Sequence, residues 1–163
     1  MAAGSELDRI DRRILAALQA DGRLTNQALS ELVALSPSAC LARVRRLERD
    51  GVIKGYHARV DPFALDVGVV LYAEVTLEGH TPAELAHFED AIVALPQVVE
   101  ASHVTGAFDY LLKVVATDVA EWTRIAEDLT SSGLGVDRIN SHVMMRKPKF
   151  FVGYPVSDAT EPR

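Results

Sequence analysis

The stretch SPSACLARVRRLERDG, residues 36–51, predicts an amphipathic helix on which the interpretation of the whole chain depends. Ser36 suits the cap of a helix and Pro37 its first position, whereas Gly51 suits its end. At about 100° per residue, one stripe of this helix is apolar. The opposite stripe is small near the N-terminus and cationic further on; it consists of Ser38, Ala42, Arg45 and Arg49, with Arg43 and Arg46 on its flank.

The polar stripe has the chemistry that DNA recognition requires. Small residues let a helix approach base edges closely, and arginines reach phosphates or guanine. An ordinary amphipathic helix with a solvated basic face explains the same pattern, and this stretch alone favours neither interpretation. The residues that we expect at DNA are Ser36, Ser38, Ala42, Arg43, Arg45, Arg46, Arg49 and Lys54.

Two further helices are predicted before this one. Asp8 caps the first helix, and Asp11 lies in its first turn, where the helix dipole favours negative charge. Thr25 opens the second helix, which stops near Ala34 and Leu35. Two short helices joined by a tight turn, the second of them basic, form a helix-turn-helix.

The residues after Gly51 are predicted to form a wing. The segment 52–60 is short and extended, with a central glycine, which fits a small β-hairpin beside the helices. Lys54 and Arg59 lie on it; either can contact backbone phosphate, although a solvated lysine is as common. Asp61-Pro62 is a natural boundary, because a residue before proline is disfavoured in a helix. We therefore assign a winged helix-turn-helix domain to residues 1–60 and a linker to 61–68.

The apolar period changes to two in the second half of the chain. Apolar and polar side chains alternate from residue 70 to 78, as in a half-buried strand. Thr81-Pro82-Ala83-Glu84 is a helix start with a capping box, and Asp118 caps a second helix. Further strands are predicted at 98–104, 110–117 and 136–146. This βαββαβ order is ferredoxin-like, so we expect an α+β chain with this domain at 69–155 and a tail at 156–163.

Helices cover only one face of a ferredoxin-like sheet, yet the strand 110–117 is largely apolar on both faces. The uncovered face must be buried, and self-association of two sheets is the economical solution. A symmetric dimer then presents two basic helices about 34 Å apart, one turn of B-DNA. This geometry favours the DNA interpretation over the solvated helix.

The distribution of charge agrees with two modules that have different partners. The net charge of the 163 residues is −6. Residues 1–60 carry 10 Lys and Arg against 7 Asp and Glu, whereas residues 61–163 carry 7 against 16. A basic front and an acidic back leave only the front for DNA. No apolar run approaches the ~20 residues of a membrane span, and no signal peptide is visible, so we expect no membrane association and a cytoplasmic location.

Motifs in the front and the back of the chain, in the family's order, give it a resemblance to the Lrp/AsnC, or feast/famine, regulators over about residues 6–155. The motifs include Leu7-Asp8-Arg9-Ile10-Asp11, Leu35-Ser36-Pro37, Gly51-Val52-Ile53-Lys54-Gly55-Tyr56 and Val104-Thr105-Gly106-Ala107-Phe108-Asp109-Tyr110. The resemblance implies a transcription regulator that binds double-stranded DNA as a homodimer, often assembled to an octamer. It also implies a ligand-sensing domain of the RAM or ACT type, to which a free amino acid binds as effector. Ala34 departs from the family, which often has glycine in this turn.

The loop Gly106-x-x-Asp109 is the candidate effector site. A hairpin turn needs the same residues, with glycine at positive φ and aspartate as a local cap. A free amino acid, however, carries both charges on one carbon and needs N–H donors beside an anion, which this loop offers. Phe108 stands where the family often has tyrosine. The candidate effector residues are Gly106, Ala107, Phe108, Asp109, Tyr110 and, on the last strand, Ser141.

No catalytic constellation is visible. The five histidines have no metal-ligand spacing, and the lone Cys40 lies on an apolar stripe, so we expect no metal and no cofactor besides the effector. We therefore predict a regulator of amino-acid metabolism or transport rather than an enzyme. Two alternatives remain: a metabolite-binding regulatory subunit of an enzyme, and an architectural DNA-binding protein without a ligand.

Overall fold

The computed structural model describes residues 7–156, which form two compact units. The first consists of residues 7–59 together with 149–156, and the second of residues 60–148. The first is named the DNA-binding unit, after the sequence prediction, and the second the sheet unit. None of the helices in the described range is long and apolar enough to cross a membrane.

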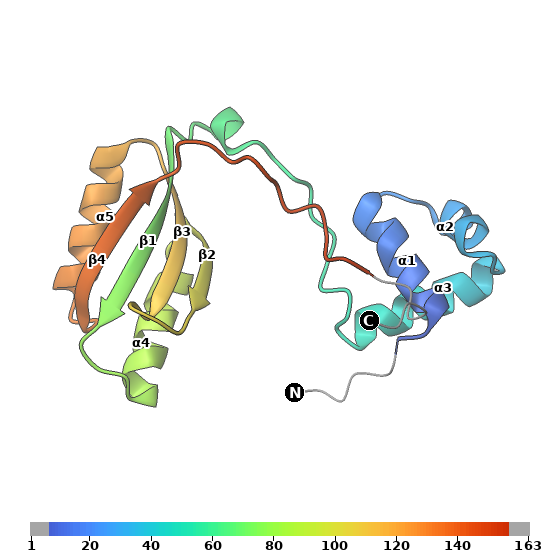
Figure 1. Cartoon of the computed structure of the whole chain (residues 1–163), viewed down its shortest axis with the longest axis horizontal. Coiled ribbons are helices and arrows are strands. Elements are labelled where there is room, and N and C mark those ends of the chain that lie inside the picture. The colour runs from blue at the N-terminus through green and yellow to red at the C-terminus, as the bar shows by residue number, and fades with distance from the viewer. Residues whose placement is uncertain (1–6, 157–163) are drawn as a thin grey trace. The chain divides into compact units, whose positions relative to one another are not determined.

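The DNA-binding unit is built on three helices whose starts agree with the sequence prediction. They are α1 (Arg9–Ala20), α2 (Asn26–Val33) and α3 (Pro37–Arg49) (Figure 1). Asp8 and Asp11 form a reciprocal capping box, and the side chains of Thr25 and Ser36 cap α2 and α3. The apolar stripes meet in one core, which contains Ile14, Leu29, Val33, Cys40 and Leu47.

The turn between α2 and α3 places a non-glycine residue in a left-handed conformation. Ala34 caps α2 with φ 58° and ψ 48°, the region in which a Cβ costs about 1–2 kcal/mol. Its N–H donates to the carbonyls of Ser30 and Glu31, so the tight turn keeps its hydrogen bonds. The turn geometry is therefore retained without glycine, at a cost in backbone strain.

The segment after α3 differs from the predicted hairpin. None of the described residues 52–60 lies in a strand, so the prediction of a β-hairpin in this segment is wrong. Gly51 takes φ 69°, and the N–H groups of Val52 and Ile53 return to the Leu47 carbonyl, so these residues close the end of α3. Residues 54–60 then continue as exposed, extended chain.

The sheet unit has the predicted βαββαβ order after a short 3-10 turn, η1 (Pro62–Leu65). Its elements are β1 (Val69–Leu77), α4 (Pro82–Val93), β2 (Val98–His103), β3 (Tyr110–Ala116), α5 (Val119–Ser131) and β4 (Val136–Val143). The antiparallel sheet has the order β2-β3-β1-β4, which Figure 1 shows. The ferredoxin-like prediction is confirmed; the last strand ends at Val143 rather than at Arg146.

The two faces of the sheet have different surroundings. One face packs against both helices in a single core, to which α4 contributes Phe88 and Ile92 and α5 contributes Trp122 and Leu129. Alternate residues of β1 and β3 are buried there, as the period of two predicts. The other face carries half-buried side chains and no covering element from the described chain; it includes Tyr72, Glu74, Thr76, Leu111, Lys113 and Val115.

The C-terminal residues differ from the predicted domain boundaries. Residues 149–155, predicted as part of the ferredoxin-like domain, and residue 156 of the predicted tail belong to the DNA-binding unit. The groove that they share with α1 is lined on the helix by Ala16, Gln19 and Ala20. The sequence of residues 149–156 has no periodic pattern of apolar residues that could reveal this contact, because the segment forms neither a helix nor a strand.

We expect Ala34→Gly to raise the free energy of unfolding of the DNA-binding unit by about 0.5–1 kcal/mol, because glycine removes the left-handed penalty. Ala42→Gly, on the exposed face of α3, is the matched control and should lower it by about 1 kcal/mol. Denaturant unfolding monitored by circular dichroism measures both. Equal destabilisation by the two glycines would contradict the strain at Ala34.

Candidate DNA-binding and effector sites

One face of α3 presents the predicted DNA-contacting residues to solvent. Ser38, Ala42 and Arg45 are exposed, and Arg49 is 72% exposed with its Nε 3.7 Å from an Asp50 carboxylate oxygen. Lys54 is also exposed, just beyond the helix. This face therefore combines a small N-terminal half with a cationic C-terminal half.

The two flanking arginines lie elsewhere. Arg43 Nη1 donates to Asp11 Oδ1 at 2.9 Å and to Asp8 Oδ2 at 2.6 Å, and Arg46 Nη2 donates to Asp11 Oδ2. Both guanidinium groups are thus bound to the start of α1. Arg43 and Arg46, both predicted at DNA, therefore take part in fixing α3 against α1, and their contact with DNA stays a prediction.

Asp11 is the centre of this ion-pair network. Its carboxylate is 0% exposed, and it also accepts the N–H of Asp8 at 3.2 Å. A buried carboxylate without partners costs several kcal/mol, which the two guanidinium groups offset here. The N–H of Asp11, and then Arg43, lower the pKa of Asp8, whose negative charge is in turn held beside Arg43. The sequence predicted a cap at Asp8 and a favourable helix-dipole interaction at Asp11, but not their ion pairs with α3.

The start of α3 is fixed by short polar contacts. Ser36 Oγ accepts the N–H of Ala39 at 3.3 Å and lies 3.2 Å from Ser38 Oγ. Asn26 Nδ2 of α2 donates to the Pro37 carbonyl at 2.8 Å. These bonds attach the first turn of α3 to α2, so the helix end that would enter a groove is held rigidly.

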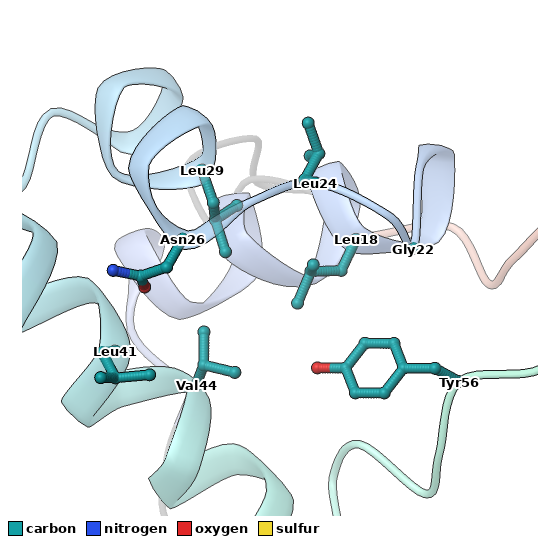
Figure 2. Close-up of a pocket in the computed structure, with 8 residues that line it drawn as sticks. All are labelled: Leu18, Gly22, Leu24, Asn26, Leu29, Leu41, Val44 and Tyr56. Atoms are coloured by element: carbon teal, nitrogen blue, oxygen red, sulfur yellow. The ribbon is translucent and has the colours of Figure 1, made fainter.

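A small open hollow of about 160 Å³ is lined by residues of α1, α2 and α3 of the DNA-binding unit. Figure 2 shows Tyr56 reaching from the segment after α3 toward Val44, opposite Leu18 and Leu29. The Tyr56 hydroxyl donates to Glu48 Oε1 at 3.0 Å. The hollow is lined mainly by aliphatic side chains, and its wall includes the residue that ties the extended segment to α3.

In the sheet unit, Asp109 joins three segments. Its N–H donates to the Val75 carbonyl at 2.9 Å, and its Oδ2 accepts the N–H of Leu77 at 2.8 Å. Its Oδ1 lies 2.8 Å from His80 Nε2. The Leu77 N–H, and then His80, hold the pKa of Asp109 below its ordinary value, so this stabilisation is present at neutral pH and is lost as the pH falls below about 4.

The remaining candidate effector residues fall into two groups. Gly106 and Ala107 are exposed, Phe108 is half-buried, and Gly106 has φ 135° with open space around it. Tyr110 lies in the core instead: its ring stacks on His103, and its hydroxyl donates to Glu89 Oε1 at 2.8 Å. Burial, together with Glu89, raises the pKa of Tyr110 to about 12.

Ser141, the last candidate effector residue, is bonded to α5. It lies on the helix-covered face of β4, opposite Ala73, and its Oγ accepts the indole N–H of Trp122 at 2.9 Å. The structure thus brings Asp109 together with His80 and Leu77, and Ser141 with α5.

His80 was not predicted as a site residue. The only signal for it in the sequence is its position three residues beyond the end of β1. Among residues 7–156, no group of three His, Cys, Asp or Glu residues is arranged to hold a metal ion.

Comparison with known proteins identifies both units. Residues 7–54 match a family model described as winged helix-turn-helix DNA-binding, and residues 70–152 match the Lrp/AsnC ligand binding domain. Together they define a transcription regulator in which a DNA-binding module is joined to a ligand-binding module. The chain belongs to the Lrp/AsnC family of transcriptional regulators, which are not enzymes.

Relatives in this family cover nearly the whole chain. The leucine-responsive regulatory proteins of Klebsiella pneumoniae and Escherichia coli are each 41% identical over 146 residues, 90% of this chain and 89% of theirs. A transcriptional regulator of Neisseria meningitidis, solved with L-methionine, superposes with a TM-score of 0.84 at 33% identity, over 92% of this chain and 97% of its own. An AsnC family regulator of Agrobacterium tumefaciens gives 0.82 at 30%, over 91% and 96%.

We expect Asp11→Asn to lower the free energy of unfolding of the DNA-binding unit by about 3 kcal/mol, because two guanidinium groups lose a buried anion. Glu31→Gln, an exposed change on α2, should stay within about 0.5 kcal/mol. Denaturant titration compares the two variants. An unfolding midpoint of Asp11→Asn equal to that of the wild type would show that the network contributes no net stability.

Proposed function

We propose that this chain controls genes of amino-acid metabolism or transport by binding specific DNA through the exposed face of α3. The observation that carries this proposal is the division of the α3 arginines. Arg43 and Arg46 are paired with Asp8 and Asp11, whereas Arg45 and Arg49 are exposed, and Arg49 lies 3.7 Å from the carboxylate of its neighbour Asp50. Beside Ser38 and Ala42, the two exposed arginines form the surface that reads base edges and phosphates, and Lys54 adds a phosphate contact.

The proposed effector is a free amino acid. The Neisseria meningitidis relative was solved with L-methionine, and the enterobacterial relatives are named for their response to leucine, so these two are the first to test. In our proposal, the exposed N–H groups at Gly106 and Ala107 face the ligand carboxylate, and Asp109 pairs with the ammonium group. The carboxylate of Asp109 is 19% exposed, which leaves a side on which to accept this further donor.

We also propose that the functional form is a homodimer assembled further toward an octamer, acting in the cytoplasm. The support is the half-buried, uncovered face of the sheet, where Leu111 and Val115 lie beside Tyr72. Pairing two such faces removes apolar surface from water and brings two copies of α3 to one DNA site. An architectural protein without a ligand would share this assembly, so the response to amino acids separates the two functions.

We expect Arg45→Ala to weaken binding to a specific site by about 1–3 kcal/mol and binding to random DNA much less. Lys54→Ala should weaken both equally and reduce the slope of log affinity against log salt by about 1. Arg124→Ala, an exposed change on α5, is the control and should leave binding unchanged. Fluorescence anisotropy with the chain's own upstream DNA measures these affinities, and equal effects on specific and random DNA from both substitutions would refute the assignment.

We expect Asp109→Ala and Asp109→Asn to abolish the response of DNA binding to methionine or leucine while DNA affinity stays unchanged. Asparagine retains an acceptor for the Leu77 N–H but lacks the charge that pairs with an ammonium group, so it separates ligand binding from folding. Asp137→Ala, an exposed change on β4, is the control. A normal ligand response in Asp109→Asn, measured by calorimetry and anisotropy, would exclude the proposed pocket.

A further inference from the structure

The described C-terminal segment is attached to α1 by a two-point contact. Gln19 Nε2 donates to the Tyr154 carbonyl at 3.0 Å, and the Tyr154 N–H donates to Gln19 Oε1 at 2.6 Å. One side-chain amide therefore satisfies both polar groups of one backbone residue, as a neighbouring strand would. This pairing fixes the register of the segment on the helix.

The local sequence suits this contact. A Cβ at Gly153 would lie 2.7 Å from Gln19 Oε1 and 2.8 Å from Gln19 Cδ, and Gly153 has φ 133°. Glycine is therefore required for the backbone to approach the amide so closely. On the helix, Ala16 and Ala20 flank Gln19 in the groove and leave room for the passing chain.

A second contact holds the segment further upstream. The guanidinium carbon of Arg59 lies 5.0 Å from the centroid of the Phe150 ring, in a cation–π arrangement. Phe151 and Tyr154 contact each other edge to face at 5.0 Å. Tyr154 as a whole is 76% exposed, and its backbone N–H and carbonyl make the hydrogen bonds to α1.

Two chain segments connect the DNA-binding unit to the sheet unit. Residues 149–156 follow β4 after only a short connection, and residues 60–68 precede β1. The DNA-binding unit is thus joined to the sheet unit through two chain segments, one continuous and one docked through hydrogen bonds. The docked segment lies on α1, the helix whose Asp11 binds Arg43 and Arg46 of α3.

We propose that residues 150–156 act as a coupling strap, a docked second connection through which the state of the sheet unit reaches α1 and hence α3. A single extended linker transmits little orientation, whereas a second attachment restricts the DNA-binding unit and converts a change in the sheet unit into a change at the DNA-reading helix. The proposed effect on DNA binding rests on the proposed amino-acid response, whereas the docking of residues 150–156 on α1 does not.

The test compares Gln19→Ala and Gly153→Ala with the control Gln27→Ala, an exposed glutamine of α2 that bonds to Glu31. Alanine is a strong helix former, so α1 persists in Gln19→Ala. Hydrogen exchange of residues 150–156 in the full chain reports docking; loss of the two bonds to Tyr154 should speed exchange about tenfold. DNA titration with and without methionine or leucine reports coupling.

We expect both strap variants to bind DNA and amino acid with wild-type affinity, and the amino acid to change their DNA affinity much less than that of the wild type. Gln27→Ala should behave as the wild type in both assays. Equally fast exchange in the wild type and in Gln19→Ala overturns the docking. Faster exchange with an undiminished response overturns the coupling alone, whereas a wild type that binds DNA but responds to no amino acid contradicts the proposed sensing and the coupling together.

Discussion

The DNA-binding unit depends on the buried carboxylate of Asp11. This group lies at the start of α1 and accepts hydrogen bonds from two arginines of α3, so the first and third helices are fixed by charge as well as by their shared apolar core. An anion removed from water requires its partners, and this requirement orients α3 more strictly than apolar packing can. Arg45 and Arg49 lie outside this network and are exposed, so in our proposal they are the arginines that contact DNA.

A second carboxylate has a comparable place in the sheet unit. Asp109 joins the start of β3 to the end of β1 and to His80, next to an exposed glycine loop. The same contacts explain the loop as a turn, and they also preorganise an anion where an ammonium group would bind. In each unit a carboxylate is fixed by hydrogen bonds: Asp11 by two arginines of α3, and Asp109 by the Leu77 N–H. Each carboxylate in turn fixes the segment beside it, α3 in one unit and the glycine loop in the other.

Local patterns predicted most of the fold. The caps at Asp8, Thr25 and Ser36 and the period of two in β1 and β3 are short-range signals, and all are confirmed. Contacts between residues distant in sequence could not be predicted: the partners of Arg43 and Arg46 lie 32–35 residues earlier, and nothing in their own helix indicates these ion pairs. The contact between Gln19 and Tyr154 spans 135 residues and leaves no periodic trace. Tyr110 was predicted both as the first residue of a strand and as a candidate effector residue; the strand is confirmed, and the ring packs against Phe88 in the core.

The central claim is that α3 uses Arg45 and Arg49 at DNA and keeps Arg43 and Arg46 on Asp8 and Asp11. Nuclear magnetic resonance of the arginine Nε–H groups, assigned by single substitution and followed during titration with the chain's own upstream DNA, tests it most directly. The account predicts that the signals of Arg45 and Arg49 shift and gain protection from exchange while those of Arg43 and Arg46 stay at their free positions. Movement of the Arg43 and Arg46 signals to DNA-bound positions, with Arg45 and Arg49 unchanged, would contradict it.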